Sequence, residues 1–311
     1  MSTGVPLDLE LAAARASSLA PTRAGWLSTL IDLVALTKPR VTVMVVATAL
    51  GGAWLAARRA GATPSATLAI ALVGTALIVG GANALNMYLE RDTDALMDRT
   101  RNRPLPSGRM APGVVLAVGL ILSAVSLPLL TFAVNAATGL LAAIALVSYV
   151  LLYTPLKRRT SAALLVGAVP GAMPPLIGWT SVTGAIELPG VLLFGVLFFW
   201  QVPHFLAIAT FRQKDYARAG MMVLPVERGE RVTRRHIVAY LVALIVVTLL
   251  LAAVGVGGPA YAASAVVLGG AFLALGAWGL RPGTGTRWAR GLFFGSMVYL
   301  VLLLTALMAG A

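Results

Sequence analysis

The feature that most constrains this chain is a series of apolar runs, each long enough to cross a lipid bilayer as a helix. A transmembrane helix needs about 20 predominantly apolar residues, and the 311-residue sequence contains nine such runs. They cover residues 41–57, 66–89, 114–133, 136–153, 162–180, 189–210, 236–255, 259–280 and 291–309. Only 11% of the residues are charged, whereas a soluble domain carries about 25%, so a soluble fold would lack the polar side chains to cover its surface. The sequence therefore predicts an all-α polytopic membrane protein with nine transmembrane helices.

The N-terminal region differs from the rest of the chain. Acidic residues interrupt its first part, which has no apolar stretch of signal-peptide length, so we expect no cleaved signal. Residues 26–36 are apolar apart from one Asp, and they predict an interfacial helix that ends at Lys38. We therefore divide the chain into a tail with an interfacial helix, residues 1–40, and a nine-helix membrane domain, residues 41–311.

The basic residues are divided unevenly between the two sides that nine spans define. Of the 24 Lys and Arg residues, 22 fall in the N-terminal tail and the long loops on one side, and only Arg58 and Arg59 fall on the other. Because basic loops stay in the cytoplasm, we expect a cytoplasmic N-terminus, cytoplasmic long loops and an external C-terminus. With so little polar surface, the net charge of +13 suits an anionic membrane face or an anionic substrate better than nucleic acid. The absence of cysteine excludes disulfides, thiolate metal sites and Cys nucleophiles.

Four of the eleven acidic residues crowd together after the second apolar run. If that run continues as a helix, a stripe on one face contains Asn86, Glu90, Asp94 and Asp98, each four residues apart. Asp92 points the other way. Acidic side chains at this spacing repel each other, and oxygen ligands without nearby Cys or His favour a hard cation such as Mg²⁺.

The alternative interpretation of this cluster is a solvated helix end whose carboxylates pair locally with Arg91, Arg99 and Arg101. Two features favour a site. The stripe begins inside the apolar run, where a polar Asn is costly, and the basic residues that follow, Arg103 among them, are suitable donors to a diphosphate. The pattern therefore predicts a metal–diphosphate site. At a wet helix end, replacement of Asp94 by Ala is expected to leave folding largely intact.

A second polar cluster follows the sixth apolar run. Its residues are Arg212, Lys214, Asp215 and Tyr216. His204 lies about two turns farther inside the membrane. Four apolar runs separate Asp94 from Asp215, which predicts two four-helix halves plus a ninth helix. The plainer alternatives are that His204 is a core residue bonded to a carbonyl or a Tyr, and that Asp215 pairs with a basic neighbour, Lys214 or Arg218.

Six segments together carry a specific resemblance. NMYLERDTDALMDRTRNRPLPSG (86–108) resembles the first aspartate-rich motif of the UbiA-type intramembrane prenyltransferases. The others resemble the branch of that family that farnesylates haem. They are LTKPR (36–40), YTPLKR (153–158), GAMPPLIGW (171–179), WQVPHF (200–205) and DYARAGMMVLP (215–225).

The resemblance implies a UbiA-like bundle in a bacterial inner membrane and a specific reaction. Farnesyl diphosphate would alkylate a vinyl group of haem b, giving haem O and releasing diphosphate. The ligands would then be farnesyl diphosphate, haem b, Mg²⁺ and the lipid bilayer, with haem A synthase as a candidate partner. The alternative acceptor within the family is a quinone precursor or another tetrapyrrole.

The resemblance also implies roles for individual residues. Mg²⁺ on the diphosphate would be held by Asn86, Glu90, Asp94 and Asp215. The leaving group would be neutralised by Arg99, Arg103, Lys157, Arg158, Arg212 and Lys214. Flat walls for the porphyrin would come from Trp179, Trp200, Phe205 and Tyr216. His204 lies at a depth suited to orienting that porphyrin, as a transient iron ligand.

The sequence departs from the family pattern at four positions. Met87 stands where many relatives have Asp, which argues against the branch that prenylates 4-hydroxybenzoate. Glu90 replaces a commoner Asp, so the ligand arm is one carbon longer. Ala219 occupies the second acidic position of the second motif, which argues against a second Mg²⁺ site but leaves the number of ions, one or two, open. Ala163 stands where an Asn is often found.

Two other classes of protein fit parts of the sequence. A secondary transporter would also have many helices and broken spans, but transporters keep coupling charges near the bilayer midplane, whereas this chain keeps nearly all of its charges at the cytoplasmic ends. A subunit with structural haem would need paired axial ligands. His236 is poorly placed for that role because it lies in an Arg-rich helix start. An intramembrane transferase is therefore the favoured class.

Overall fold

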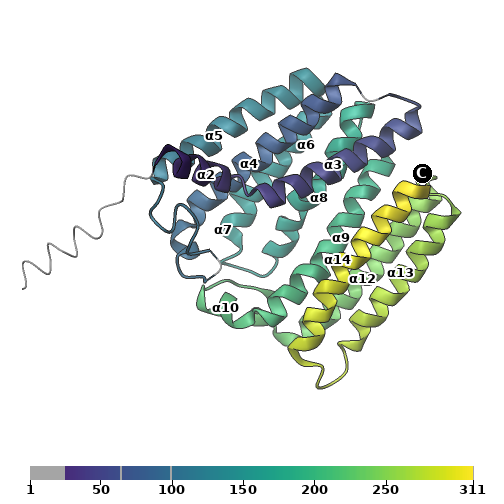
Figure 1. The fold of residues 1–311 in the computed structure, drawn as a ribbon. Coiled ribbons are helices and arrows are strands. Elements are labelled where there is room, and N and C mark those ends of the chain that lie inside the picture. Colours follow the sequence, from purple (N-terminus) through teal and green to yellow (C-terminus); the bar gives the residue numbers. More distant parts are fainter. Residues whose placement is uncertain (1–24, 64, 99, 311) are drawn as a thin grey trace, which may run out of the picture.

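The computed structural model describes residues 25–63, 65–98 and 100–310, and within them the chain is all-helical (Figure 1). Nine of the described helices are long and apolar enough to span a membrane, which confirms the predicted fold class. The first four spans are α3 (Pro39–Ala60), α4 (Ala66–Asp94), α5 with the π-helix η1 (Pro112–Pro128, Leu129–Val134), and α6 with the π-helix η2 and α7 (Ala136–Val147, Ser148–Tyr153, Thr154–Leu156). The other spans are α8 (Ala163–Thr183), α9 (Leu188–Phe211), α12 (Gly229–Ala253), α13 (Pro259–Trp278) and α14 (Gly285–Gly310). Predictions on residues 1–24 lie outside the described residues.

The apolar runs located every span but not the full length of every helix. Helices α12 and α14 begin several residues before the runs predicted at 236 and 291. Arg and Glu are good helix formers, so a helix continues into water after its apolar run has ended. For the same reason the expected loop 211–235 is partly helical, with α10 (Gln213–Arg218), α11 (Leu224–Glu227) and the start of α12.

The helices form two groups that meet along α3 and α8. In the first group α4 packs against α3, α5 and α6, and in the second α9 packs against α8, α12 and α14. Helix α13 packs against α12 and α14, so α14 is the ninth helix of the predicted arrangement. Gly52 of α3 and Gly178 of α8 allow the closest approach, because a Cβ at either position would collide with the carbonyl oxygen of Pro175 or Ala49. Small residues of this kind let membrane helices pack backbone to backbone.

The segment predicted as an interfacial helix is α2 (Trp26–Leu36), and it is attached to the loop that follows α4. Several of its large apolar side chains are exposed, whereas Asp32 is buried. Arg109 Nε donates to both carboxylate oxygens of Asp32, at 3.0 and 3.2 Å. The same guanidinium donates to Ser107 Oγ and to the Asn102 carbonyl. Asp32 therefore ties α2 to the loop that carries the predicted diphosphate-binding arginines.

Candidate active site

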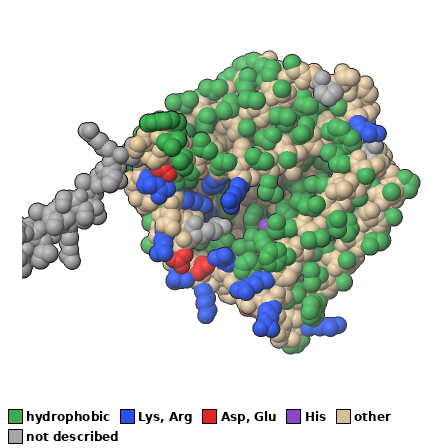
Figure 2. Space-filling view, viewed as in Figure 1, with side chains coloured by type: hydrophobic (Ala, Val, Ile, Leu, Met, Phe, Trp, Pro, Cys, Tyr) green, Lys and Arg blue, Asp and Glu red, His purple; other side chains and the backbone are tan. Residues whose placement is uncertain are grey.

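The loops that follow α4, α7 and α9 lie at one end of the bundle. Figure 2 shows a hollow in this part of the molecule, with Lys and Arg side chains around it, acidic side chains nearby and a histidine side chain within it. Hydrogen bonds donated by backbone N–H groups join two of these loops. Met222 N–H donates to the Lys157 carbonyl at 3.1 Å, and Ser161 N–H donates to Glu227 Oε2 at 2.5 Å.

The predicted stripe on α4 exists, but it is shorter and drier than expected. Asn86, Glu90 and Asp94 are buried, with 3%, 6% and 2% of their surface exposed. The helix ends at Asp94, because the Asp94 carbonyl accepts a hydrogen bond from Thr100 Oγ1 at 2.8 Å and the backbone turns. The prediction that Asp98 continues the stripe is therefore wrong. The expectation of a wet helix end at Asp94 is also wrong.

Each buried carboxylate of the stripe is paired with a cation from outside helix α4. Lys157 Nζ forms an ion pair with Glu90 Oε1, and Arg103 Nη1 lies 2.6 Å from Asp94 Oδ2. Local pairing with neighbouring arginines, the alternative interpretation, holds only for the exposed acids. Arg91 lies 3.8 Å from Asp92, and Arg101 lies 3.7 Å from Asp98.

A π-helical turn positions the partner of Asn86. At the end of η2, Thr154 Oγ1 donates to the Tyr149 carbonyl at 2.8 Å and accepts from Asn86 Nδ2 at 3.0 Å. The amide nitrogen of Asn86 is thereby occupied, and its Oδ1 remains as an acceptor. π-Turns are rare and often found at functional sites. The sequence analysis missed Thr154, although it lies inside the YTPLKR motif.

Lys38 is a second residue that the sequence analysis missed as part of the site. Its Nζ lies 3.4 Å from Asn86 Oδ1. Among the described residues, Lys38 is the one non-glycine residue with a positive φ, at 49°. It lies directly before the Pro that begins α3. Burial is the main cause that lowers the pKa of Lys38 to about 8, and Arg103 acts in the same direction while Glu90 and Asp94 oppose it. A Lys–Pro pair at the entrance to the first span was the available signal.

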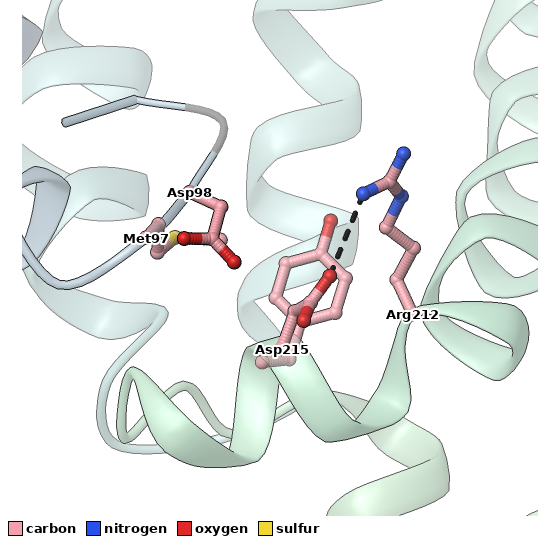
Figure 3. Close-up of a pocket in the computed structure, with 5 residues that line it drawn as sticks. Met97, Asp98, Arg212 and Asp215 are labelled. Atoms are coloured by element: carbon pink, nitrogen blue, oxygen red, sulfur yellow. Dashed lines mark hydrogen bonds and ion pairs between the residues drawn. The ribbon is translucent and has the colours of Figure 1, made fainter. Parts of the chain in front are cut away.

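The second acidic motif lies on the short helix α10 and is more exposed. The Asp215 side chain is 35% exposed and lies 3.4 Å from Arg212 and 2.7 Å from Arg218, each three residues away. Pairing with Arg218 was the plainer alternative for Asp215, and it is confirmed. A pocket beside it is lined by Met97, Asp98, Arg212, Asp215 and Tyr216 (Figure 3). Asp98 of the loop after α4 therefore lies with the second motif.

The remaining basic residues of the predicted site contribute no ion pair among the described residues. Lys214 and Arg158 are exposed and make no ion pair with any described residue. Arg99 lies outside the described residues.

The interior wall of the site contains His204, whose partner differs from the carbonyl or Tyr that we expected of a core residue. Its Nδ1 lies 2.7 Å from Ser296 Oγ of α14. Trp200 stacks on the imidazole with ring centroids 4.8 Å apart, and Phe205 meets it edge-on at 5.4 Å. Ser296 lies beyond every motif that the sequence analysis singled out.

Two other predictions about aromatic and histidine residues are settled by the structure. Trp179 is fully buried, and its Nε1–H donates to Glu187 Oε2 at 2.8 Å at the start of α9, the opposite end of that helix from Arg212. The prediction that Trp179 forms a porphyrin wall is therefore wrong. His236 Nδ1 lies 2.9 Å from the Val232 carbonyl of its own helix, away from His204.

The comparison with protein families decides the identity of the fold. The model described as the UbiA prenyltransferase family matches residues 45–298. This chain belongs to the UbiA prenyltransferase family. Among relatives, a protoheme IX farnesyltransferase of Sorangium cellulosum is 61% identical over 280 residues, which are 86% of this chain and 100% of the relative. A protoheme IX farnesyltransferase of Myxococcus xanthus is 53% identical over 94% of this chain and 97% of the relative.

Solved structures share the fold at low sequence identity. A digeranylgeranylglyceryl phosphate synthase matches with a TM-score of 0.80 and 16% identity, covering 91% of this chain and 98% of its own. A UbiA homolog from Archaeoglobus fulgidus bound to GPP and Mg²⁺ matches with a TM-score of 0.64 and 16% identity, covering 89% and 99%. Family membership thus makes this chain an integral multi-pass membrane protein.

The donor chemistry of the α4 face suits a hard cation. Glu90 Oε1 is buried and, apart from its ion pair with Lys157, has no hydrogen-bond partner among the described residues. Carboxylate and amide oxygens are the donors that Mg²⁺ prefers. No three Asp, Glu or His side chains among the described residues are gathered closely enough to hold a metal, so Asp215 does not join Glu90 and Asp94 in one cluster.

Proposed function

We propose that this chain transfers a farnesyl group from farnesyl diphosphate to a vinyl group of haem b, giving haem O and diphosphate. The observation that carries the proposal is the arrangement of polar and aromatic side chains at different depths of the site. Buried carboxylates and cations lie at the loop end, and an aromatic wall with His204 lies about two turns deeper. The full-length match to relatives named protoheme IX farnesyltransferase supports the choice of haem as acceptor.

At the diphosphate end we assign Asn86, Glu90 and Asp94 to a Mg²⁺ ion. Asp215, which the resemblance suggested as a further ligand, would join them only if the exposed second motif moved toward α4. The cation would neutralise and polarise the diphosphate oxygens. Electrostatic stabilisation of the departing charge is usually the largest catalytic contribution. The residues assigned to it are Arg99, Arg103, Lys157, Arg158, Arg212 and Lys214. We add Lys38, because its Nζ lies 3.4 Å from Asn86 Oδ1.

At the acceptor end the chemistry requires a dry apolar space. The C1–O bond of farnesyl diphosphate breaks with its electron pair on diphosphate, and the vinyl π-electrons form the new C–C bond to the allylic cation. The porphyrin-stabilised cation that results adds water and loses a proton, which gives the hydroxyl group of haem O. Trp200, Phe205 and Tyr216 are assigned to contact the porphyrin, and basic residues at the loop end are assigned to meet its propionates.

We place the chain in a bacterial inner membrane, with the N-terminus and active-site loops cytoplasmic and the C-terminus periplasmic. The uneven distribution of Lys and Arg supports this orientation, and haem A synthase is the partner that would consume haem O. A reporter fused after Ala311 should be periplasmic, and one inserted at Gly108 should be cytoplasmic. Both reporters on one side would contradict the orientation.

Activity is tested by incubating the purified protein with haem b, farnesyl diphosphate and Mg²⁺ and measuring the mass of the pigment. The expected product has the mass of haem b plus one farnesyl group and one hydroxyl group. Prenylation of 4-hydroxybenzoate or of another tetrapyrrole, with haem left unchanged under the same conditions, would contradict the proposed acceptor.

A further inference from the structure

A serine of α14 determines how the imidazole of His204 is protonated. Ser296 is fully buried, and its Oγ lies 2.7 Å from His204 Nδ1 and 2.6 Å from the Phe293 carbonyl oxygen. A hydroxyl has one proton to donate, and a carbonyl oxygen only accepts, so the Ser296 proton is directed to Phe293. Ser296 Oγ therefore accepts from His204 Nδ1–H. The neutral imidazole then carries a lone pair on Nε2.

The same serine also holds the aromatic side chain that stacks on the imidazole. Trp200 Nε1–H donates to the Ser296 carbonyl at 2.7 Å, and the Trp200 ring lies 27° from the His204 ring plane. The Phe293 ring of α14 lies 4.8 Å from the imidazole. His204 is thus fixed by contacts from both α9 and α14. It remains half-buried, and its Nε2 has no hydrogen-bond partner among the described residues.

The depth of His204 suits the acceptor rather than the diphosphate. It precedes Arg212 by eight residues on α9, which places it about 12 Å deeper. A neutral imidazole with a free ring nitrogen, set among aromatic side chains, is a common ligand for haem iron. The partner of the other ring nitrogen normally fixes the ring orientation of such a ligand.

We propose that Ser296 is a positioning residue that holds His204 with its Nε2 lone pair directed at the iron of the porphyrin substrate. The inference rests on the proposed function, and it specifies a metalloporphyrin as the acceptor rather than any flat apolar ring. The axial bond fixes the height of the porphyrin in the membrane. A vinyl edge is thereby brought toward the farnesyl carbon held at the α4 end of the site.

The test compares porphyrins with and without iron, in the absence of farnesyl diphosphate. Purified wild type, His204→Ala and Ser296→Ala are titrated with ferric haem b and with metal-free protoporphyrin IX. Both variants should weaken haem binding by about tenfold or more, which is the usual effect of losing a metal-ligating His or its partner. Both should bind metal-free protoporphyrin as wild type does, and both should lose the absorption spectrum of imidazole-bound haem. Added imidazole should restore that spectrum in His204→Gly.

Ser123→Ala is the matched control. Ser123 is also buried in a span and also donates to a carbonyl of its own helix, that of Gly119 at 2.8 Å, but it has no imidazole partner. It should behave as wild type. Unchanged binding of metal-free protoporphyrin shows that each variant is folded.

The outcomes separate the inference from the proposed function. Equal weakening for both porphyrins would show that His204 is only a flat wall and would overturn the inference. Wild-type haem affinity and spectrum in Ser296→Ala would overturn the role of Ser296. Failure of the wild type to bind either porphyrin would contradict the proposed function, and the inference with it.

Discussion

The two acidic motifs of this protein lie in opposite environments. Glu90 and Asp94 are buried on a long helix, and their cations come from outside that helix, Arg103 from the loop that follows it and Lys157 from the end of α7. Asp215 is partly exposed on a six-residue helix, and its cations are its own neighbours. A buried carboxylate is tolerated only when it is paired and hydrogen-bonded, whereas an exposed pair contributes little. The first motif is therefore part of the fold, and the second is a surface element that can rearrange.

This difference has a consequence for ligand binding. In the structure the positive charges beside Glu90 and Asp94 are supplied by Lys157 and Arg103. A Mg²⁺ ion held by these carboxylates would take the place of the two side chains, and Lys157 and Arg103 would then be free for the diphosphate oxygens. The second motif needs no such exchange, because Arg212 and Arg218 already face water.

The largest expected difference between the motifs is in turnover. Asp94→Asn keeps a hydrogen-bond acceptor for Arg103 but removes the charge, and it should lower the rate of haem O formation by about 1,000-fold, the upper range for one electrostatic group. Asp215→Asn should lower it by about tenfold, because its site is wetter and its charge better screened. Initial rates at saturating substrates check both values. Equal losses in the two variants would remove the functional distinction between the motifs.

The motifs should also differ in stability. Asp94→Ala leaves Arg103 unpaired beside a buried face, which typically costs about 3–5 kcal/mol. Asp215→Ala breaks exposed pairs and should cost about 0–1 kcal/mol. Thermal unfolding in one detergent, at one pH, compares them, with Asp92→Ala as a control at an exposed position of the first motif. A stable Asp94→Ala protein would show that the first motif is not integral to the fold.

The brace between α2 and the first motif's loop should have an intermediate effect. Asp32→Asn weakens a charged hydrogen-bond pair to Arg109, a change of about 1–3 kcal/mol. Because the braced loop carries Arg103, we expect a higher KM for farnesyl diphosphate with kcat nearly unchanged. Steady-state kinetics measure KM for farnesyl diphosphate and kcat separately. A fall in kcat alone would mean that the brace does not act through diphosphate binding.

The hydrogen bond from Ser161 N–H to Glu227, which holds the second motif's loop, should have the smallest effect on stability. The hydrogen bond from Ser161 N–H is the main cause that lowers the pKa of Glu227 below 4.5. This hydrogen bond therefore contributes its full stability above pH 4.5. The contribution is lost as the pH falls through the lowered pKa of Glu227 in the folded protein. Amide exchange at Ser161, corrected for intrinsic rates, should therefore accelerate on acidification. In Glu227→Gln the Ser161 amide should exchange faster at neutral pH, and its corrected exchange rate should not rise further on acidification. An acid step of the same size in the variant would assign it to another group.

The sequence predicted the features that depend on composition and local spacing. Nine apolar runs located nine spans because the bilayer sets their length, and spacing of four placed Asn86, Glu90 and Asp94 on one face. It did not predict that α4 ends at Asp94. That end depends on a hydrogen bond from the Thr100 hydroxyl to the Asp94 carbonyl, and the spacing of the acidic residues does not indicate such a bond. The misplaced Asp98 and the supposed wet end at Asp94 both follow from that.

Residues that act across the bundle were beyond the sequence argument. Ser296 lies 92 positions from His204, and no periodicity links α14 to α9. Lys38 and Thr154 were inside recognised motifs, but their contacts to Asn86 depend on a left-handed backbone and on a π-turn. Trp179 was misassigned because its motif gives no depth within the span.

The central claim, that the buried motif rather than the exposed one binds Mg²⁺ and diphosphate together, is tested most directly by calorimetric binding of farnesyl diphosphate with and without Mg²⁺. Wild type and Asp215→Asn should both bind more tightly with Mg²⁺, by about tenfold or more, as expected when a cation bridges carboxylates and phosphate. Glu90→Gln should lose that enhancement while keeping the weaker metal-free binding. Full Mg²⁺ enhancement in Glu90→Gln, with its loss in Asp215→Asn, would contradict the account.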